Sequence, residues 1–319
     1  MGYPMIDLNR TAVRYPSVLV IGGTGFIGGH LVAQLAATGR RVIVPTRHGS
    51  RSRKFSVLPT VEVVEANVHD AATLSGLARQ ADAVINLVGV LHSGRGAAGS
   101  RYGPAFAAAH VALPKKIITA CTVAGVHRYL HMSALGAAID GSSMYLRSKA
   151  DGEEAALTSL LDTTVFRPSV VFGPDDQFLN LFAQLQKFFP VMPLGGAEAR
   201  FQPVYVGDVA QAFVNALENP ATFGKVYELG GPRVYTLREL VMLAGALSGH
   251  ARPVLALPPA LARLQAFALE WLPGGPLMSR DNLDSMQQDN VLHGPIAPEL
   301  GIVPSALETI APRYLRPHG

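Results

Sequence analysis

The sequence predicts a doubly wound, parallel α/β sheet followed by a smaller C-terminal α/β lobe. Three observations predict it: short runs rich in β-branched residues, helical patterns that alternate with these runs, and a glycine-rich turn between the first run and the first helix. The 319 residues suffice for about two domains, or one large domain with an appended lobe. We expect residues 12–175 to form the main sheet and 176–319 mainly the lobe, with strands around 201–230 able to return to the sheet.

The runs of the main sheet lack clean alternation, which is typical of strands buried on both faces. They span Val18 to Ile21, Arg41 to Thr46, Val61 to Glu65, Ala83 to Val88, Arg128 to Met132 and Thr163 to Val171. The helical patterns between them span Phe26 to Ala37, Ala71 to Arg79, Pro104 to Ala124 with a kink or restart at Pro114, and Ser143 to Leu160. This alternation predicts parallel pairing.

Beyond Gly173-Pro174 the alternation loosens, which predicts the smaller lobe. Expected helices span Phe178 to Phe189, Asp208 to Glu218 with Asp208 as N-cap, Thr236 to Leu247 and Pro258 to Leu272; expected strands span Phe201 to Val206 and Lys225 to Leu229. The last of these helices has an apolar face but is too short to cross a bilayer. It either packs on the lobe, covers a lipid-like substrate, or rests on a partner or a membrane surface.

Composition and charge exclude several classes of protein. With 49% hydrophobic and 16% charged residues, disorder is excluded, and a single cysteine excludes disulfide scaffolds and thiolate metal clusters. No acidic residue occurs between Asp7 and Glu62, where six basic residues gather: Arg40, Arg41, Arg47, Arg51, Arg53 and Lys54. This local charge favours an anionic small ligand, and no nucleic-acid pattern accompanies it. Asp175-Asp176 has no further ligand at metal-binding spacing, so we expect a solvated loop and no metal.

The segment Ser17 to Gly39 has no Asp, Glu, Lys or Arg over 23 residues, but six glycines interrupt it. A strand, a turn and a helix explain it better than a membrane span. Met1 to Arg10 lacks the apolar core of a signal peptide. We therefore expect a cytoplasmic protein, either free or peripheral at the inner face of the membrane.

A glycine-rich turn joins the first strand to the first helix, and it reads Gly22-Gly23-Thr24-Gly25-Phe26-Ile27-Gly28. Without Cβ atoms the backbone can approach a diphosphate closely, and the free N–H groups and dipole of the helix N-terminus favour negative charge. The position in the first strand–helix–strand unit is the context that this motif requires. The turn therefore predicts a dinucleotide-binding cradle.

The second strand ends at Pro45-Thr46-Arg47, where NAD-binding sites usually place an acid that holds the ribose 2′-hydroxyl. Here the acid is missing and an arginine is present. A guanidinium pairs bidentately with phosphate and stacks on adenine, so we expect Arg47 to hold a 2′-phosphate, with Arg51 or Arg53 assisting. NADP(H) is therefore the expected cofactor, and NAD(H) is less favoured.

Tyr145 and Lys149 lie four residues apart on one helix, and Ser133 closes the preceding strand. A free tyrosine, with a pKa near about 10, is a poor acid or base at neutral pH. A nearby ammonium and a cationic nicotinamide both favour the phenolate, and a serine hydroxyl can hold a substrate oxygen. The three residues predict proton transfer at a carbonyl or alcohol carbon.

These residues resemble the short-chain dehydrogenase/reductases, especially the extended and atypical branches. The resemblance runs over the glycine-rich turn, Ser133, Tyr145-x-x-x-Lys149, the segment Arg167 to Pro174 and the segment Gln202 to Ala210. It implies a Rossmann domain in which Tyr145 is the acid/base and Lys149 holds the nicotinamide ribose. The dinucleotide neighbours that it implies are Asn67 and Val68 at the adenine, Leu87, Val88 and Gly89 at the middle, and Pro168, Val170 and Val171 beside the nicotinamide.

A narrower resemblance rests on His131 to Gly136, Pro276 to Asn282 and Asp289 to Val291. These segments are similar to bacterial relatives of the nucleotide-binding accessory subunit of respiratory complex I, a class that holds NADPH without a known need for turnover. Where many extended members carry an asparagine, this chain has His110, which is either a proton relay or a partly buried helix residue.

Three functions stay open. The chain is an oxidoreductase acting on an unknown small substrate, a non-catalytic nucleotide-binding accessory or assembly factor of a respiratory or quinone-related membrane complex, or a nucleotide-sugar epimerase or dehydratase. The intact Ser133, Tyr145 and Lys149 favour the first function. The C-terminal resemblance favours the second, and the absence of an acid beside Arg47 counts against the third.

Overall fold

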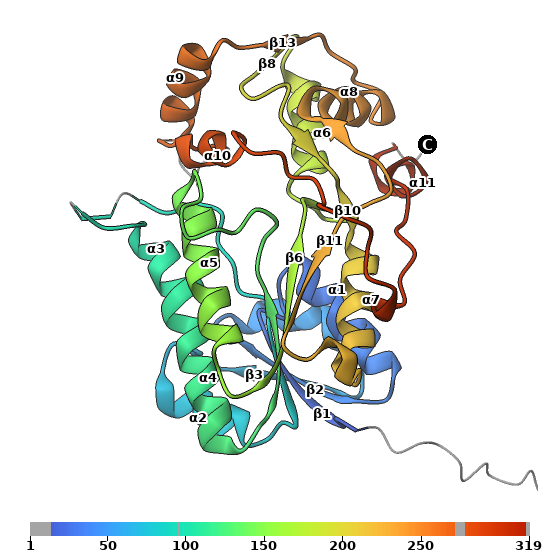
Figure 1. Cartoon of the computed structure of the whole chain (residues 1–319). Helices are drawn as coiled ribbons and strands as arrows, with labels where there is room; N and C mark the ends of the chain where they lie inside the picture. The colour runs from blue at the N-terminus through green and yellow to red at the C-terminus, as the bar shows by residue number, and fades with distance from the viewer. Residues whose placement is uncertain (1–13, 95, 98, 272–277, 317–319) are drawn as a thin grey trace, which may run out of the picture.

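The computed structural model describes residues 14–94, 96–97, 99–271 and 278–316. Seven parallel strands form the main sheet in the order β11-β6-β5-β4-β1-β2-β3 (Figure 1). Their bounds are β1 Ser17–Ile21, β2 Arg41–Thr46, β3 Val61–Glu65, β4 Ala83–Asn86, β5 Arg128–Met132, β6 Asp162–Pro168 and β11 Lys225–Leu229. The predicted doubly wound sheet is confirmed, and the strand at 225–229 returns to its edge.

Helices cover both faces of this sheet, because its strands are apolar on both sides. On one face α1 (Phe26–Ala37) packs against α7 (Val206–Leu217). The other face carries α2 (Ala71–Ala78), α4 (Leu113–Ala124) and α5 (Met144–Leu157). Each face has its own core, so the central strands are buried completely.

The lobe lies beyond the carboxyl edge of the sheet (Figure 1). Its core is built on α6 (Leu179–Phe188), α8 (Leu237–Leu247), α11 (Leu307–Ile310) and α12 (Pro312–Leu315). Three two-stranded pairs complete it: β7 (Val171–Phe172) with β10 (Val204–Tyr205), β8 (Met192–Leu194) with β13 (Val254–Ala256), and β9 (Arg200–Phe201) with β12 (Tyr235–Thr236). Helices α9 (Pro259–Leu269) and α10 (Arg280–Ser285) stand above α5.

Several expected elements differ in extent. The run 201–206 is not one strand, because β9 and β10 are separate and α7 already begins at Val206. Asp208 is therefore not an N-cap: it lies in the first turn of α7 and accepts hydrogen bonds from the backbone and hydroxyl of Ser305. The helix expected over 104–124 is interrupted by a π-helical turn over Ala107–Ala112, between α3 (Pro104–Phe106) and α4, with Pro114 in the first turn of α4. The end of the predicted helix at Leu272 lies outside the described residues.

The strand order places a switch point between β1 and β4, since the chain runs outward to β2 and β3 before crossing back to β4. In open parallel sheets the loops at the carboxyl ends on either side of this point leave a crevice where ligands bind. The glycine-rich turn follows β1, and residues 87–89 follow β4. The fold therefore brings these two segments to the same edge.

Candidate nucleotide-binding site

The glycine-rich turn packs directly against the segment after β4. Gly22 has φ +86°, a conformation that favours glycine, and a Cβ there would lie 3.1 Å from the carbonyl carbon of Leu87 and 3.2 Å from the nitrogen of Val88. A Cβ on Gly28 would collide with the backbone of Gly22 and Gly23. These two glycines thus let α1 begin close against the turn.

The N-terminus of α1 fits an anionic group. Its N-cap, Gly25, is exposed and supplies no side-chain acceptor for the N–H groups of the first turn, which includes Phe26 and Ile27. Uncapped N–H groups at the positive end of a helix dipole are suited to phosphate oxygens. Because Gly25 is exposed and has no Cβ, the turn can hold a diphosphate, with Thr24 beside it.

The basic stretch lies at the carboxyl ends of β2 and β3. Arg47 is exposed after β2, and its charge helps lower the pKa of His69, whose burial is the larger cause. Asn67 is exposed beside it, and its side-chain oxygen accepts from the backbone N–H of His69. The arrangement brings Arg47 together with the segment predicted to flank adenine. Arg53 is exposed nearby in the chain, and the side chain of Arg51 lies outside the described residues.

Lys54 has a closer contact with the glycine-rich turn than sequence reasoning assigned to it. Its Nζ donates to the carbonyls of Thr24 at 2.8 Å and Gly25 at 3.2 Å, from the 3₁₀ helix Gly49–Phe55. A Cβ on Gly29 would lie 2.9 Å from this Nζ. Gly29, directly after the motif, was the available signal, since it leaves room for a long side chain beside α1.

Residues 88–90 connect the turn to the region of Ser133, Tyr145 and Lys149, the predicted proton-transfer residues. Val88 is held by its backbone N–H, which donates to the side chain of Asn86. The Cα of Gly89 is close enough to two site groups that a Cβ there would lie 3.8 Å from His110 Nε2 and 3.9 Å from Lys149 Nζ. The predicted diphosphate and nicotinamide ends of the site are therefore continuous.

The structure brings Ser133, Tyr145 and Lys149 to this edge. Lys149 is 3% exposed, and its Nζ donates to the carbonyl of Met132 at 2.7 Å, just before Ser133. The Ser133 hydroxyl is buried without a hydrogen-bond partner within the described chain, while Tyr145 is half-buried on the first turn of α5. An unpartnered buried hydroxyl is costly, so Ser133 is suited to a ligand oxygen.

Burial dominates the electrostatics of these groups. It raises the pKa of Tyr145 to about 12 and lowers the pKa of Lys149 to about 8, the latter against the opposing charge of Glu153. The chain's own groups therefore do not produce the lowering of the tyrosine pKa that we expected from Lys149. A bound nicotinamide would supply a hydride and, when oxidised, a positive charge. Tyr145 would then hold or move the proton, with Ser133 orienting the oxygen.

His110 is fixed and not placed as a free relay. It is 1% exposed, its Nε2 accepts from the Val90 N–H at 3.0 Å, and its Nδ1 lies 2.8 Å from the hydroxyl of Ser148. Because Ser148 donates onward to the carbonyl of Tyr145, the Nδ1 of His110 carries the proton. Burial and the charge of Lys149 lower the pKa of His110 to about 2. Of the two alternatives for His110, the geometry therefore favours a buried helix residue over a proton relay.

Two residues of the C-terminal segments, Asn290 and Asp281, hold parts of the candidate site in place, although the sequence alone assigned them no role. Asn290 Oδ1 accepts from the Ser169 hydroxyl at 2.6 Å and from the Val170 N–H at 3.1 Å, and so fixes the segment between Pro168 and Val171. Asp281 accepts from the N–H groups of Met144 at 2.7 Å and Tyr145 at 3.0 Å. Both contacts join residues more than 100 positions apart, so no local pattern could reveal them.

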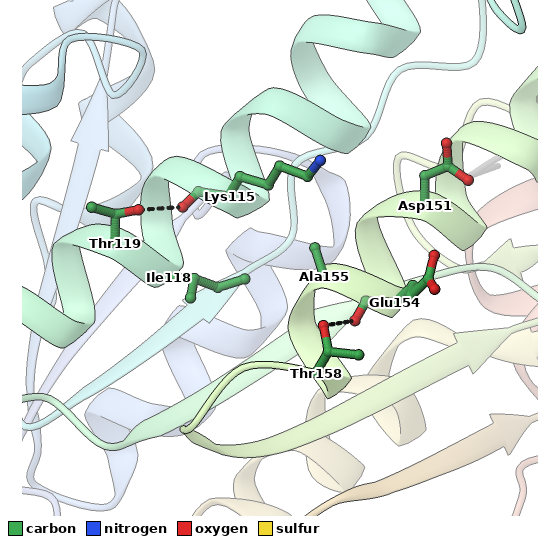
Figure 2. A pocket seen from close by; sticks show the side chains of 7 residues that line it. All are labelled: Lys115, Ile118, Thr119, Asp151, Glu154, Ala155 and Thr158. Carbon is green, nitrogen blue, oxygen red and sulfur yellow. Dashed lines mark hydrogen bonds between the residues drawn. The ribbon is translucent and has the colours of Figure 1, made fainter.

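A separate surface hollow of about 430 Å³ lies between α4 and α5 (Figure 2). Its lining residues are Lys115, Ile118, Thr119, Asp151, Glu154, Ala155 and Thr158. Two threonine hydroxyls there bond only to helix carbonyls one turn back, those of Lys115 and Glu154. None of the predicted site residues lines this hollow, and it plays no part in the site.

Asp176 differs from its expected solvated loop. Its side chain is 3% exposed and accepts hydrogen bonds from the N–H groups of Gly173 and Phe178 and from the hydroxyl of Tyr314. These hydrogen bonds fix the segment that leads into α6. In the described ranges, no group of three or more histidine, cysteine or acidic residues is arranged to hold a metal ion. Nor does any helix there have the length and apolarity needed to cross a membrane.

Comparison with known proteins agrees with this geometry. The family model described as "NAD dependent epimerase/dehydratase family" matches residues 18–230. NADH dehydrogenase (ubiquinone) 1 alpha subcomplex subunit 9 of Arabidopsis thaliana is 32% identical over 297 residues, covering 89% of this chain and 72% of that protein. Ceramide reductase of Caulobacter vibrioides is 30% identical over 258 residues, covering 80% and 78%.

Among solved structures, UDP-glucose 4-epimerase of Thermotoga maritima with UDP-glucose has a TM-score of 0.68 at 21% identity, covering 94% of this chain and 97% of that one. At this identity the likeness establishes the fold alone. With a family model that matches most of the chain and a Rossmann sheet that places the glycine-rich turn at its switch point, the chain belongs to the NAD-dependent epimerase/dehydratase family and is related within it to the accessory subunit of respiratory complex I.

Proposed function

We propose that this chain is a nucleotide-binding accessory or assembly factor of a respiratory membrane complex, and that it holds NADP(H) as a bound ligand. The observation that carries the proposal is the extent of similarity to the complex I subunit. That similarity covers 89% of the chain, whereas the general family model ends at residue 230, before most of the C-terminal lobe. The lobe is the part that a shared binding partner would recognise.

The preference for NADP(H) is supported by charge. The exposed Arg47 follows β2 where NAD-binding proteins usually carry an acid, and Lys54 places a second cation against the carbonyls of the glycine-rich turn. A 2′-phosphate between β2 and the turn would meet positive charge from both sides. The protein would lie peripherally at the membrane and would bind no nucleic acid.

The test uses a deletion strain of the source organism complemented with full-length variants. Tyr145→Phe removes the phenol and leaves the cradle, so assembled NADH dehydrogenase in the membrane should stay at the wild-type level. Gly25→Val places a side chain over the N-terminus of α1, at a φ of −73° that other residues adopt and with its Cβ 3.2 Å from the carbonyl oxygen of Gly22, so assembly should fall. Loss of assembly with Tyr145→Phe, or full assembly with a Gly25→Val chain that binds no nucleotide, would contradict the proposal.

A second candidate is oxidoreductase activity, favoured by the complete Ser133, Tyr145 and Lys149 and by the unpartnered hydroxyl of Ser133. It also agrees with the similarity to a ceramide reductase. Purified protein should then oxidise NADPH in the presence of a carbonyl substrate, and Tyr145→Phe should lower that rate by about a hundredfold or more. If bound nucleotide is oxidised by no substrate in a carbonyl panel, the accessory role stands alone.

A further inference from the structure

Helix α9 is apolar on two opposite sides. Ala262 and Ala266 are buried against the lobe, as expected for an amphipathic helix. At about 100° per residue, Leu261, Leu264 and Phe267 fall within an arc of about 120° on the other side. These three side chains are 43–62% exposed. A helix that packs only on its own lobe would carry polar residues on that outer arc.

Trp271 extends the outer arc beyond the end of α9. Its backbone N–H donates to the carbonyl of Ala268, which continues the turn, and its ring meets the ring of Phe267 edge-on at 6.3 Å. The side chain is 76% exposed. An exposed tryptophan at the end of an apolar arc is typical of helices that lie at a water–membrane interface.

Neighbouring segments continue the same surface around β8. The side chain of Gln265 on α9 donates to the carbonyl of Pro193, and Pro193 is paired with Leu255 of β13. The turn that leads into β8 adds three more exposed apolar side chains. We define the apolar end surface as Phe188, Phe189, Val191, Leu255, Leu261, Leu264, Phe267 and Trp271, all of which are exposed.

The charges around this surface are mostly positive. Over residues 184–194 and 250–271 the charged residues are Lys187, Arg252, Arg263 and Glu270. Glu270 accepts hydrogen bonds from the guanidinium of Arg280 on α10, from Nη2 at 2.6 Å and from Nε at 3.1 and 3.2 Å, so its charge is compensated. Arg263 lies 3.2 Å from Asp284, but its side chain remains 55% exposed. Because Arg263 and Glu270 are both paired with residues of α10, the surplus cations that border the apolar area are Lys187 and Arg252.

We propose that the apolar end surface rests on the headgroup layer of an anionic bilayer, with the arc of α9 and the Phe188–Phe189 turn entering the interface. This inference rests on the proposed function and names the surface by which the chain would stay at a membrane. Exposed apolar area of this extent marks a protein or a lipid contact. The surplus of cations with aromatic and leucine side chains matches anionic lipid, to which α9 would lie parallel.

The test is flotation of the purified full-length protein with vesicles of phosphatidylcholine, alone or mixed with phosphatidylglycerol. Wild-type protein should float with the mixed vesicles and about tenfold less with phosphatidylcholine alone. A chain carrying both Leu264→Glu and Trp271→Glu should lose flotation by about tenfold or more, and Lys187→Glu should weaken it in a salt-dependent way. Leu160→Glu is the matched control, because Leu160 is 97% exposed and precedes β6 at the opposite edge of the sheet.

Nucleotide affinity, measured on every variant, verifies that each chain is folded. The lipid assignment would be overturned if the chain with Leu264→Glu and Trp271→Glu still floated like wild type, or if every variant floated as well as the Leu160→Glu control. It would also be overturned by a wild-type chain that stays unbound while the double variant abolishes a self-associated state or complex assembly, since the surface would then serve a protein. The accessory role itself is judged separately by complementation with Gly25→Val, so failure here leaves that test unaffected.

Discussion

Arg47 and Lys54 lie on the same short stretch but act on different parts of the candidate site. Lys54 is fixed against the glycine-rich turn by two carbonyls, whereas Arg47 stands exposed beside the segment that begins at Asn67. A cation fixed at the turn should favour the binding of any dinucleotide, because its charge lies close to where the diphosphate would bind. An exposed guanidinium beside the adenosine end contributes to a nucleotide that carries a third phosphate. We therefore propose that Arg47 decides between NADP(H) and NAD(H).

Arg47→Ala should lower NADPH affinity by about 10- to 100-fold, or about 1.4–2.8 kcal/mol, and leave NADH affinity unchanged within about twofold. The measurement is fluorescence titration of purified protein with both nucleotides. Arg79→Ala, at the exposed end of α2, is the control and should change neither affinity. A preference for NADH that survives Arg47→Ala would refute the cofactor assignment.

Two buried histidines make stability depend on pH. Burial lowers the pKa of His110 to about 2 and of His131 to about 3, so both stay neutral in the folded chain where the unfolded chain takes up protons. Their contribution is complete above the unfolded pKa of about 6.5 and is lost as the pH falls toward the folded values. Each histidine should cost about 1.4 kcal/mol of unfolding free energy per pH unit below about pH 6.

His110→Gln removes one of these two contributions and keeps an acceptor for the Val90 N–H. The difference in unfolding free energy between wild type and variant should therefore shrink as the pH falls from about 7.5 to 5. Urea unfolding at several pH values measures it. Parallel pH profiles of the two proteins would mean that His110 already titrates with an ordinary pKa in the folded state.

At the scale of elements, the first turn of α5 depends on α10. Ser143 caps α5 with its own side chain, and Asp281 adds a carboxylate that binds the N–H groups of Met144 and Tyr145. A negative charge at this end is favourable to the helix dipole. Since α10 belongs to the lobe, the lobe fixes the helix that carries the tyrosine.

Asp281→Ala should lower the free energy of unfolding by about 1–2 kcal/mol, because two N–H groups lose a charged acceptor. Hydrogen exchange of the Met144 and Tyr145 amides should accelerate more than exchange in the last turn of α5. Asp284→Ala, on the same short helix, is the control: it removes the partly exposed pair with Arg263 and an exposed hydrogen bond from the side chain of Gln287, but no hydrogen bond to α5. Equal protection of the two amides in both variants would show that α10 does not hold α5.

Arg128 connects a strand and a helix from inside the molecule. Its fully buried guanidinium donates to the carbonyls of Ala216, Leu217 and Asp162, and so closes the end of α7 against the start of β6. Arg128→Met should lower the free energy of unfolding by about 3 kcal/mol or more, because these carbonyls lose their donor. Denaturant unfolding measures it. Arg41→Met, which breaks an exposed pair with Glu62, should cost less than about 1 kcal/mol.

At the scale of the whole molecule, local pattern was enough to place six of the seven strands in the main sheet. The β-branched runs and the glycine-rich turn predict six strands and the edge where ligands bind, because burial on both faces and φ > 0 leave direct marks in sequence. The return of β11 to that sheet was left open, since a strand's neighbour is not written in its own residues.

What the sequence missed depends on distant partners. Asp208 has the residue type of an N-cap, but its carboxylate is taken by Ser305, and the helix starts two residues earlier. Asn290 and Asp281 act on segments more than 100 residues away. Spacing predicts Ser133, Tyr145 and Lys149 as a group, and their role stays a prediction. The direction of the Tyr145 pKa shift depends on burial, which spacing does not report.

Two adjacent residues of α10 face opposite ways in this network. Arg280 holds Glu270 at the end of α9, and Asp281 holds the amide of Tyr145. If contact of the lobe with a membrane shifted α10 and thereby changed the affinity for a dinucleotide, the dinucleotide would change the affinity for the membrane by the same factor. A measured dependence of nucleotide affinity on lipid, of either sign, would then give the coupling free energy that Arg280 and Asp281 transmit between the outer surface of the lobe and the candidate nucleotide site.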